Sequence, residues 1–388
     1  MALSLFPYLL VAAKEAEGEK KEVLILTATS GDTGKAALEG FKDVPGTHIQ
    51  VFYPTDGVSP MQAEQMQKQE GENANVNVTA IHGNFDDAQQ FLKRLFVDKA
   101  TAEEVAEKGV MFSSANSINI GRLAPQVVYY VNAYAELVAQ GAIHEDEAFN
   151  VVVPTGNFGN ILAAYYAKKM GLPIAKFICA SNENNVLTDF IKTGVYNKNR
   201  DFHTTISPSM DILISSNLER FLYDLTGCDD KLVSEWMKEL NTNGSYEVSA
   251  DVKAKMQEMF TAGCCDDAET MATIKKCASE YDYVIDTHTA VAKSVYDKYV
   301  AQTGDTTKTI IASTASPFKF NQSVLIALED HNAVVGKDEF TLLKELSEKS
   351  NMQIPKSLYE LKDKSVVFDL VCDKDEMQQI VSDFLMVE

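Results

Sequence analysis

Positive charge is scarce in this sequence. Among its 388 residues, 35 lysines and arginines stand against 56 aspartates and glutamates, which gives a formal net charge of −21. An acidic surface repels the phosphate backbone of nucleic acids, so we expect no nucleic-acid partner. A phosphorylated small ligand would need hydrogen-bond donors gathered at one place, because the overall electrostatic field opposes its binding.

Long apolar runs are also missing. No stretch reaches the roughly 18 apolar residues of a membrane-spanning helix, so we expect no membrane span. The apolar segment 1–13 lacks the preceding basic residues of a signal peptide, and its apolar positions follow the pattern of one helix face.

The cysteines and histidines form no recognisable framework. The six cysteines include no C-x-x-C pair, and six are too few to cross-link a chain of this length. We therefore expect reduced thiols and a cytoplasmic protein. No histidine has metal-binding spacing with another histidine or a cysteine, so we expect no metal site. The sequence gives no indication of an oligomeric state.

Short β-branched runs alternate with helical stretches along the chain. The predicted strands are 23–27, 49–53, 76–81, 150–153, 176–179, 309–312 and 366–371. The predicted helices are 35–41, one opened by Ser59 and Pro60, 86–96, 119–140, 161–170, one carrying Leu342, Leu343 and Leu346, and 377–385. Strands separated by helices of roughly 10–20 residues predict a parallel α/β architecture.

Two glycine-containing turns each follow a predicted buried strand and lead into a helix. They are Thr29-Ser30-Gly31-Asp32-Thr33-Gly34 and Gly156-Asn157-Phe158-Gly159-Asn160. Ligands of α/β folds bind at the carboxyl ends of strands, and helix N-termini offer unpaired N–H groups to anions. The sequence therefore predicts two anion-binding turns; a ligand-free, glycine-capped connection is the simpler alternative for either one alone.

A nucleotide-binding P-loop does not account for the first turn. The motif G-x-x-x-x-G-K-[ST] would need glycine where Thr29 stands, and serine or threonine where Ala36 stands. The second turn does not match the dinucleotide pattern G-x-G-x-x-G either. Both sequences argue against nucleotide binding.

The sequence resembles the threonine synthases of bacteria and fungi. The similarity is carried by several segments in family order, which together span nearly the whole chain: 28–34, 114–122, 154–160, 207–212, 286–292 and 313–320. The resemblance implies a pyridoxal-phosphate (PLP) enzyme of fold type II, like tryptophan synthase β, with two α/β domains and the cofactor between them. We place the parts at 1–145, 146–330 and a C-terminal appendage at 331–388.

The resemblance also implies roles for individual residues. Cofactor binding falls to Gly156, Asn157, Phe158, Gly159 and Asn160 at the phosphate, Thr314 at the pyridine nitrogen, and Asp32 near the phenolic oxygen. Substrate binding falls to Thr29, Ser30, Gly31, Thr33, Asn116, Ser117, Asn119 and Arg122. Arg122 is the candidate for the substrate phosphate, because a guanidinium group suits it; a surface salt bridge is the alternative. His288 is expected to be structural, with proton transfer as the alternative.

The family reaction converts O-phospho-L-homoserine and water into L-threonine and phosphate. In the family, the Schiff-base lysine stands just ahead of a helix that resembles residues 1–10, so by this alignment it would precede Met1. Lys35 and Lys319 do not match its position. We therefore expect threonine synthase read from an internal start, and we keep an inactive paralogue that binds PLP or a phosphorylated ligand as the alternative. A threonine dehydratase-like eliminase fits the segments 30–34 and 207–211 less well.

Overall fold

The computed structural model describes residues 2–70 and 75–384, which fold as two compact units. The first unit contains residues 1–125 and 354–388, and the second contains residues 126–353. The sequence prediction placed boundaries after residues 145 and 330, so the expected appendage 331–388 is shared between the two units. It returns to the first unit because the short strand β11 (Val371–Cys372) pairs with β3 (Val76–Ile81) of that unit.

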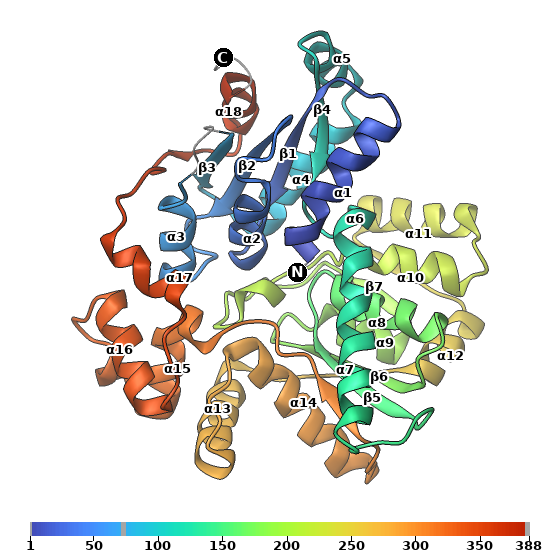
Figure 1. Ribbon diagram of the computed structural model, residues 1–388. Coiled ribbons are helices and arrows are strands. Elements are labelled where there is room, and N and C mark those ends of the chain that lie inside the picture. The colour runs from blue at the N-terminus through green and yellow to red at the C-terminus, as the bar shows by residue number, and fades with distance from the viewer. Residues whose placement is uncertain (1, 71–74, 385–388) are drawn as a thin grey trace. The chain divides into compact units, whose positions relative to one another are not determined.

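The first unit is built on a parallel sheet of five strands in the order β11-β3-β2-β1-β4 (Figure 1). Its remaining strands are β1 (Glu22–Ala28), β2 (Thr47–Pro54) and β4 (Val110–Ser114). Its helices are α1 (Ala2–Ala16), α2 (Asp32–Phe41), α3 (Pro60–Gln67), α4 (Phe85–Val97), α5 (Lys99–Glu107), α6 (Ile120–Leu123), α17 (Lys356–Tyr359), η5 (Glu360–Asp363) and α18 (Met377–Phe384).

The second unit is built on a parallel sheet of four strands in the order β10-β5-β6-β9, with a separate antiparallel pair β7-β8. The strands are β5 (Phe149–Pro154), β6 (Ile174–Ser181), β7 (Val195–Asn197), β8 (Ser245–Glu247), β9 (Phe260–Cys264) and β10 (Thr309–Ile311). The helices are α7 (Val127–Ala139), α8 (Gly159–Lys169), α9 (Val186–Thr193), η2 (Pro208–Met210), α10 (Leu218–Leu225), α11 (Asp230–Asn243), α12 (Ala250–Met259), α13 (Asp267–Tyr281), α14 (Thr287–Thr303), η3 (Pro317–Phe320), α15 (Asn321–Leu328), η4 (His331–Ala333) and α16 (Glu339–Ser350).

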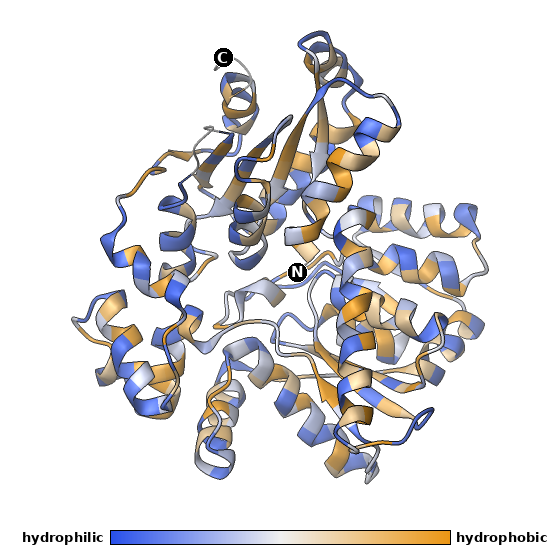
Figure 2. Ribbon diagram, viewed as in Figure 1, coloured by the Kyte–Doolittle hydropathy of each residue, from blue (hydrophilic) through white to orange (hydrophobic). Residues whose placement is uncertain are grey.

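Both parallel sheets lie in the cores of their units. Every residue of β5 is buried, and in β1 only the first residue is exposed. Figure 2 shows these strands mainly in the colour of hydrophobic residues. Continuous apolar strands are typical of parallel sheets covered on both faces, so the predicted α/β class is confirmed, whereas β4 and β9 were not predicted.

Two predicted elements are wrong in extent. The helix expected over 119–140 is divided into α6, the 3₁₀ turn η1 (Ala124–Gln126) and α7. Pro125 lies at the break, because proline has no N–H for the helix ladder and its ring crowds the preceding turn. The strand expected over 366–371 shrinks to β11, because the N–H groups of Val367 and Phe368 both donate to the carbonyl of Gln67.

No helix within residues 2–70 and 75–384 is both long and apolar enough to cross a membrane.

Candidate functional site

The first turn, Thr29–Gly34, joins β1 to α2 in the first unit. The hydroxyl oxygen of Thr29 accepts the N–H of Gly31 at 2.9 Å and that of Gly34 at 2.8 Å. Thr29 is buried, so these two bonds replace water for the turn. The Thr29 hydroxyl therefore serves the backbone of its own turn.

Gly31 is required at its position by both conformation and space. Its φ is 124°, and a Cβ would lie 2.3 to 2.5 Å from the side-chain amide of Gln62. That amide donates to Asp32 Oδ1 at 3.1 Å and accepts the N–H of Ser59 at 3.0 Å. Gln62 therefore orients the Asp32 carboxylate. Sequence analysis missed this residue, although Ser59 and Gln62 have the spacing of a helix capping box, which α3 shows.

The segment after β4 lies beside the first turn, because β4 and β1 are parallel neighbours and their carboxyl ends share one edge. Asn116 binds both backbone groups of Ala28: its Nδ2 donates to the carbonyl at 2.7 Å, and its Oδ1 accepts the N–H at 3.1 Å. The structure thus brings together the two predicted substrate segments. The Asn116 side chain holds them to each other.

The side chain of Asn119 is the N-cap of α6, where its Oδ1 accepts the N–H of Gly121 at 2.9 Å. Its Nδ2 donates to the carbonyl of Ser114 at 3.0 Å. Arg122 lies on this short helix and Ser117 precedes it, both partly buried. Asn119 therefore sets the direction in which the segment carrying Ser117 and Arg122 leaves the sheet.

The second turn, Gly156–Asn160, joins β5 to α8 in the second unit. The helix begins at Gly159, no side chain caps it, and its first turn has no acidic residue. The first N–H groups of a helix have no partner within it, and together with the helix dipole they attract anions. This turn is therefore a better site for a phosphate dianion than the first, whose helix begins with Asp32.

Phe158 contributes to this turn through its backbone. It has a left-handed conformation, with φ at 59°, and its side chain is only 1% exposed. The ring lies 5.7 Å from that of Phe221 and 5.8 Å from that of Phe260, within an aromatic cluster of the core. Burial of the ring stabilises a backbone conformation that is unfavourable for a non-glycine residue.

The second turn fits a phosphorylated cofactor by two observations. Gly156 is packed so closely that a Cβ would lie 2.6 Å from the carbonyl oxygen of Ser209. The Oδ1 of Asn157 is buried, and among the described residues it has no hydrogen-bond partner. The close packing fixes the N–H groups of the turn, which can donate to an anion, whereas Asn157 Oδ1 is an acceptor and would pair with a hydrogen-bond donor of the ligand.

Tyr130, which sequence analysis missed, supports the last residue of the turn. This tyrosine on α7 donates its hydroxyl hydrogen to Oδ1 of Asn160. Burial raises the pKa of Tyr130 far above its usual value, so the hydroxyl remains a donor at every physiological pH. A contact across 30 positions has no local sequence signal.

Thr314 follows β10, which pairs in parallel with β5, so it leaves the sheet at the same edge as the second turn. Its side chain is exposed. Lys35, in contrast, is held away from cofactor chemistry, because its amine donates to Glu39 at 3.0 Å and also to Gln69. The predicted site residues therefore form one group in each unit: 29–33 with 116–122, and 156–160 with 314.

Comparison with known proteins connects these two groups to a family. Residues 5–251 match the family described as pyridoxal-phosphate dependent enzyme, and residues 289–380 match threonine synthase, C-terminal. Threonine synthase of Saccharomyces cerevisiae is 37% identical over 359 residues, which are 88% of this chain and 67% of that protein. The chain belongs to the threonine synthase family of PLP-dependent enzymes.

Two further relatives define this threonine synthase-type chain more closely. Human Threonine synthase-like 1 is 43% identical over 338 residues, which are 85% of this chain. The chain spans only 43% of that relative's length. The PLP-bound threonine synthase of Brucella melitensis has a TM-score of 0.80 and 34% identity, covering 99% of this chain and 74% of that one. The expected fold type II and the expected cofactor, PLP, are therefore confirmed.

Proposed function

We propose that this chain carries the catalytic fold of a threonine synthase, which converts O-phospho-L-homoserine and water into L-threonine and phosphate. The observation that carries the proposal is the N-terminus of α8, which has no side-chain cap and no acidic residue in its first turn. The closely packed Gly156 precedes it in the same turn. In this assignment the N–H groups of residues 156–160 bind the cofactor phosphate. The six cysteines form no disulfide with one another, which is in keeping with the proposed cytoplasmic location.

The remaining assignments follow from the two groups. Thr314 presents a neutral hydroxyl for the pyridine nitrogen, at the strand edge from which the second turn also leaves. When bound, PLP supplies an electron sink for the bonds at the substrate α-carbon. In this assignment the first turn holds the substrate carboxylate through groups other than the N–H of Gly31 and of Gly34, which Thr29 accepts. Gln62 holds the Asp32 carboxylate in a fixed direction.

Arg122 is assigned to the substrate phosphate. Its segment is fixed by the cap of Asn119 and by the bonds from Asn116 to Ala28. A guanidinium group on such a segment can bind phosphate through two parallel hydrogen bonds. We propose that the bonds of Asn116 and Asn119 orient the segment so that the Arg122 guanidinium group faces the substrate.

A second candidate function is a protein that binds PLP or a phosphorylated ligand without turnover. It is favoured by the relatives of 43% identity, which carry the name Threonine synthase-like 1. The two functions share both turns and differ only in whether product forms.

Incubation with PLP and O-phospho-L-homoserine tests the first proposal, in a form of the purified protein that carries the Schiff-base lysine expected ahead of residue 1. We expect threonine and inorganic phosphate in equal amounts, measured by amino-acid analysis and a phosphate assay. Cofactor binding without either product would overturn threonine synthase activity and leave the second candidate.

A pair of alanine variants tests the assignment of the two turns. Gly156→Ala places a methyl group 2.6 Å from Ser209 O, and Gly34→Ala places one 2.4 Å from a Thr29 methyl carbon. We expect Gly156→Ala to weaken pyridoxamine 5′-phosphate binding about tenfold or more in equilibrium dialysis. Gly34→Ala should retain that binding and raise KM for the substrate. The reverse pattern would place the cofactor phosphate in the first turn.

A further inference from the structure

The second turn is supported by a separate segment of its own unit, residues 203–217. The carbonyl of Ser209 packs against Gly156, as described above. Ser215 Oγ donates to the carbonyl of Gly156 at 2.8 Å, and the N–H of Asn217 donates to the carbonyl of Asn157 at 3.1 Å. The position of this segment, called here the support segment, therefore fixes where the first residues of the phosphate-binding turn lie.

The centre of the support segment is held by a buried carboxylate. Asp211 is only 5% exposed. Its Oδ1 accepts from Asn182 Nδ2 at 2.7 Å, Asn184 Nδ2 at 3.0 Å and Thr205 Oγ1 at 2.7 Å. Its Oδ2 accepts the N–H of Thr205 at 2.9 Å. Four donors to one carboxylate make a strong, directional anchor.

His288 holds the same segment from a second side. This histidine is 2% exposed, and its Nε2 accepts the N–H of Ser209 at 3.1 Å. The hydrogen of the neutral ring is therefore on Nδ1, which faces Asp286 Oδ1 at 3.4 Å. Asp286 caps α14 by accepting the N–H groups of His288 and Thr289, so this orientation is built into the start of the helix.

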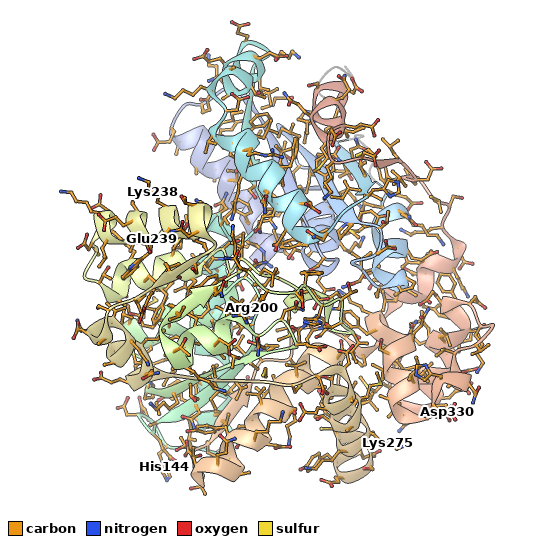
Figure 3. All side chains as sticks on the ribbon, turned by 180° about the vertical axis from the view of Figure 1, so that it is seen from behind. His144, Arg200, Lys238, Glu239, Lys275 and Asp330 are labelled. Carbon is orange, nitrogen blue, oxygen red and sulfur yellow. The ribbon has the colours of Figure 1, made fainter. Side chains whose placement is uncertain are left out.

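The ends of the support segment are fixed separately from its centre. Before it, Arg200, which Figure 3 labels, donates to Asn185, Asp189 and the carbonyl of Asn197. Within it, the Tyr196 hydroxyl donates to the carbonyl of Leu213 at 3.0 Å and accepts the N–H of Ser215 at 2.8 Å. Asp211 and His288 thus act on the centre of the segment, where Ser209 lies against Gly156, and Asn182 adds bonds to the carbonyl and hydroxyl of Ser207.

We propose that Asp211 and His288 are positioning residues for cofactor binding: they hold residues 207–211 against Gly156 and so keep the phosphate-binding turn in its binding conformation. The inference rests on the assignment of residues 156–160 to the cofactor phosphate. Neither side chain is required to touch the cofactor. His288 acts through the N–H of Ser209, and Asp211 acts through its bonds to Asn182, Asn184 and Thr205.

The test measures the affinity contributed by the phosphate group. Pyridoxamine 5′-phosphate and pyridoxamine are compared by equilibrium dialysis, because neither forms an imine with lysine. Asp211→Asn turns an N–H₂ group toward one of the four donors, and His288→Leu removes the acceptor of the Ser209 N–H. We expect each variant to bind the phosphorylated compound about tenfold more weakly, with pyridoxamine binding unchanged.

Rescue and a matched control separate positioning from general stability. His288→Gln restores an acceptor for the Ser209 N–H and should return affinity to within about threefold of the wild type. Asp305→Asn alters another carboxylate with several donors, Asn150, Tyr299 and Thr307, at the opposite end of the β5-β10 pair. It should leave the affinity unchanged. Emission of Trp236, the only tryptophan, checks that the second unit of each variant is folded.

The possible failures distinguish the positioning inference from the phosphate assignment. If Gly156→Ala loses the phosphorylated ligand while Asp211→Asn and His288→Leu retain it, the positioning inference is wrong and the phosphate assignment stands. The same conclusion follows if His288→Gln binds as weakly as His288→Leu. If Gly156→Ala also binds normally, the phosphate assignment itself is wrong.

Discussion

The two turns of this protein have the same place in their sheets but are stabilised in different ways. The first is held by side chains close to it in sequence or in the adjacent strand connection: Thr29 within the turn, Gln62 on α3 and Asn116 after β4. The second is held from outside, by Tyr130 on α7 and by the support segment. In the first turn two N–H groups are already bound by Thr29, whereas α8 has no side-chain cap.

This difference indicates which ligand each turn suits. A turn that satisfies its own donors and carries Asp32 has less capacity for a doubly charged anion. When other segments fix the backbone of a turn, the N–H groups of that turn can donate to the ligand. Residues that support a binding site from outside hold its hydrogen-bond donors in position while those donors stay available to the ligand.

The largest expected effect comes from removing the aromatic anchor of the second turn. Phe158→Ala deletes a buried ring and should cost about 3–5 kcal/mol of unfolding free energy. Urea unfolding followed by Trp236 emission measures it, since Trp236 lies in the second unit. Binding of pyridoxamine 5′-phosphate should be lost with it, because the ring stabilises the left-handed backbone.

Phe41→Ala is the matched change in the first unit, where the ring is equally buried and contacts Phe6. It should lower the stability of that unit and leave pyridoxamine 5′-phosphate binding intact. If Phe41→Ala and Phe158→Ala lose ligand binding equally, the conclusion that only the second turn binds the phosphorylated ligand is wrong.

A smaller effect is expected from the side chain that caps the first turn. Thr29→Val keeps the shape but leaves the N–H groups of Gly31 and Gly34 without their acceptor, at a cost of about 1–3 kcal/mol. Hydrogen exchange of the peptide covering α2 should accelerate, while cofactor affinity stays unchanged. Unaltered exchange in α2 would show that Thr29 does not stabilise the turn.

The smallest effect is expected from Tyr130→Phe, which removes one donor from Asn160 and should cost about 1 kcal/mol. Because burial raises the pKa of Tyr130, deprotonation is disfavoured in the folded protein, so the contact should persist in the wild type between pH 6 and about 10. Ligand affinity measured over that range should show a constant difference from the variant. Tyr134→Phe, on the same helix, removes the acceptor of the Asp146 N–H and should leave affinity unchanged.

The strands that precede the two turns could be predicted from the sequence, whereas the distant side chains that hold the turns in place could not. Strand β3 was predicted at its observed bounds, and the helix start at Ser59 and Pro60 was predicted because its signals are adjacent in the chain. The division of the predicted helix 119–140 at Pro125 was overlooked, although a proline inside a helix commonly breaks it. The roles predicted for individual site residues stay predictions, and the structure adds that Thr29, Asn116 and Asn119 already bind backbone groups.

The sequence alone determined the α/β class, the places of the two turns and, through its family segments, the cofactor. These properties depend on residues close together in the chain, where hydrophobic periodicity and glycine act locally. Only the tertiary structure decided that Gln62 orients Asp32, that Tyr130 binds Asn160 and that Asp211 and His288 hold the support segment. Those contacts join residues 27 to 79 positions apart, and the chain brings them together only when its parallel sheets are formed.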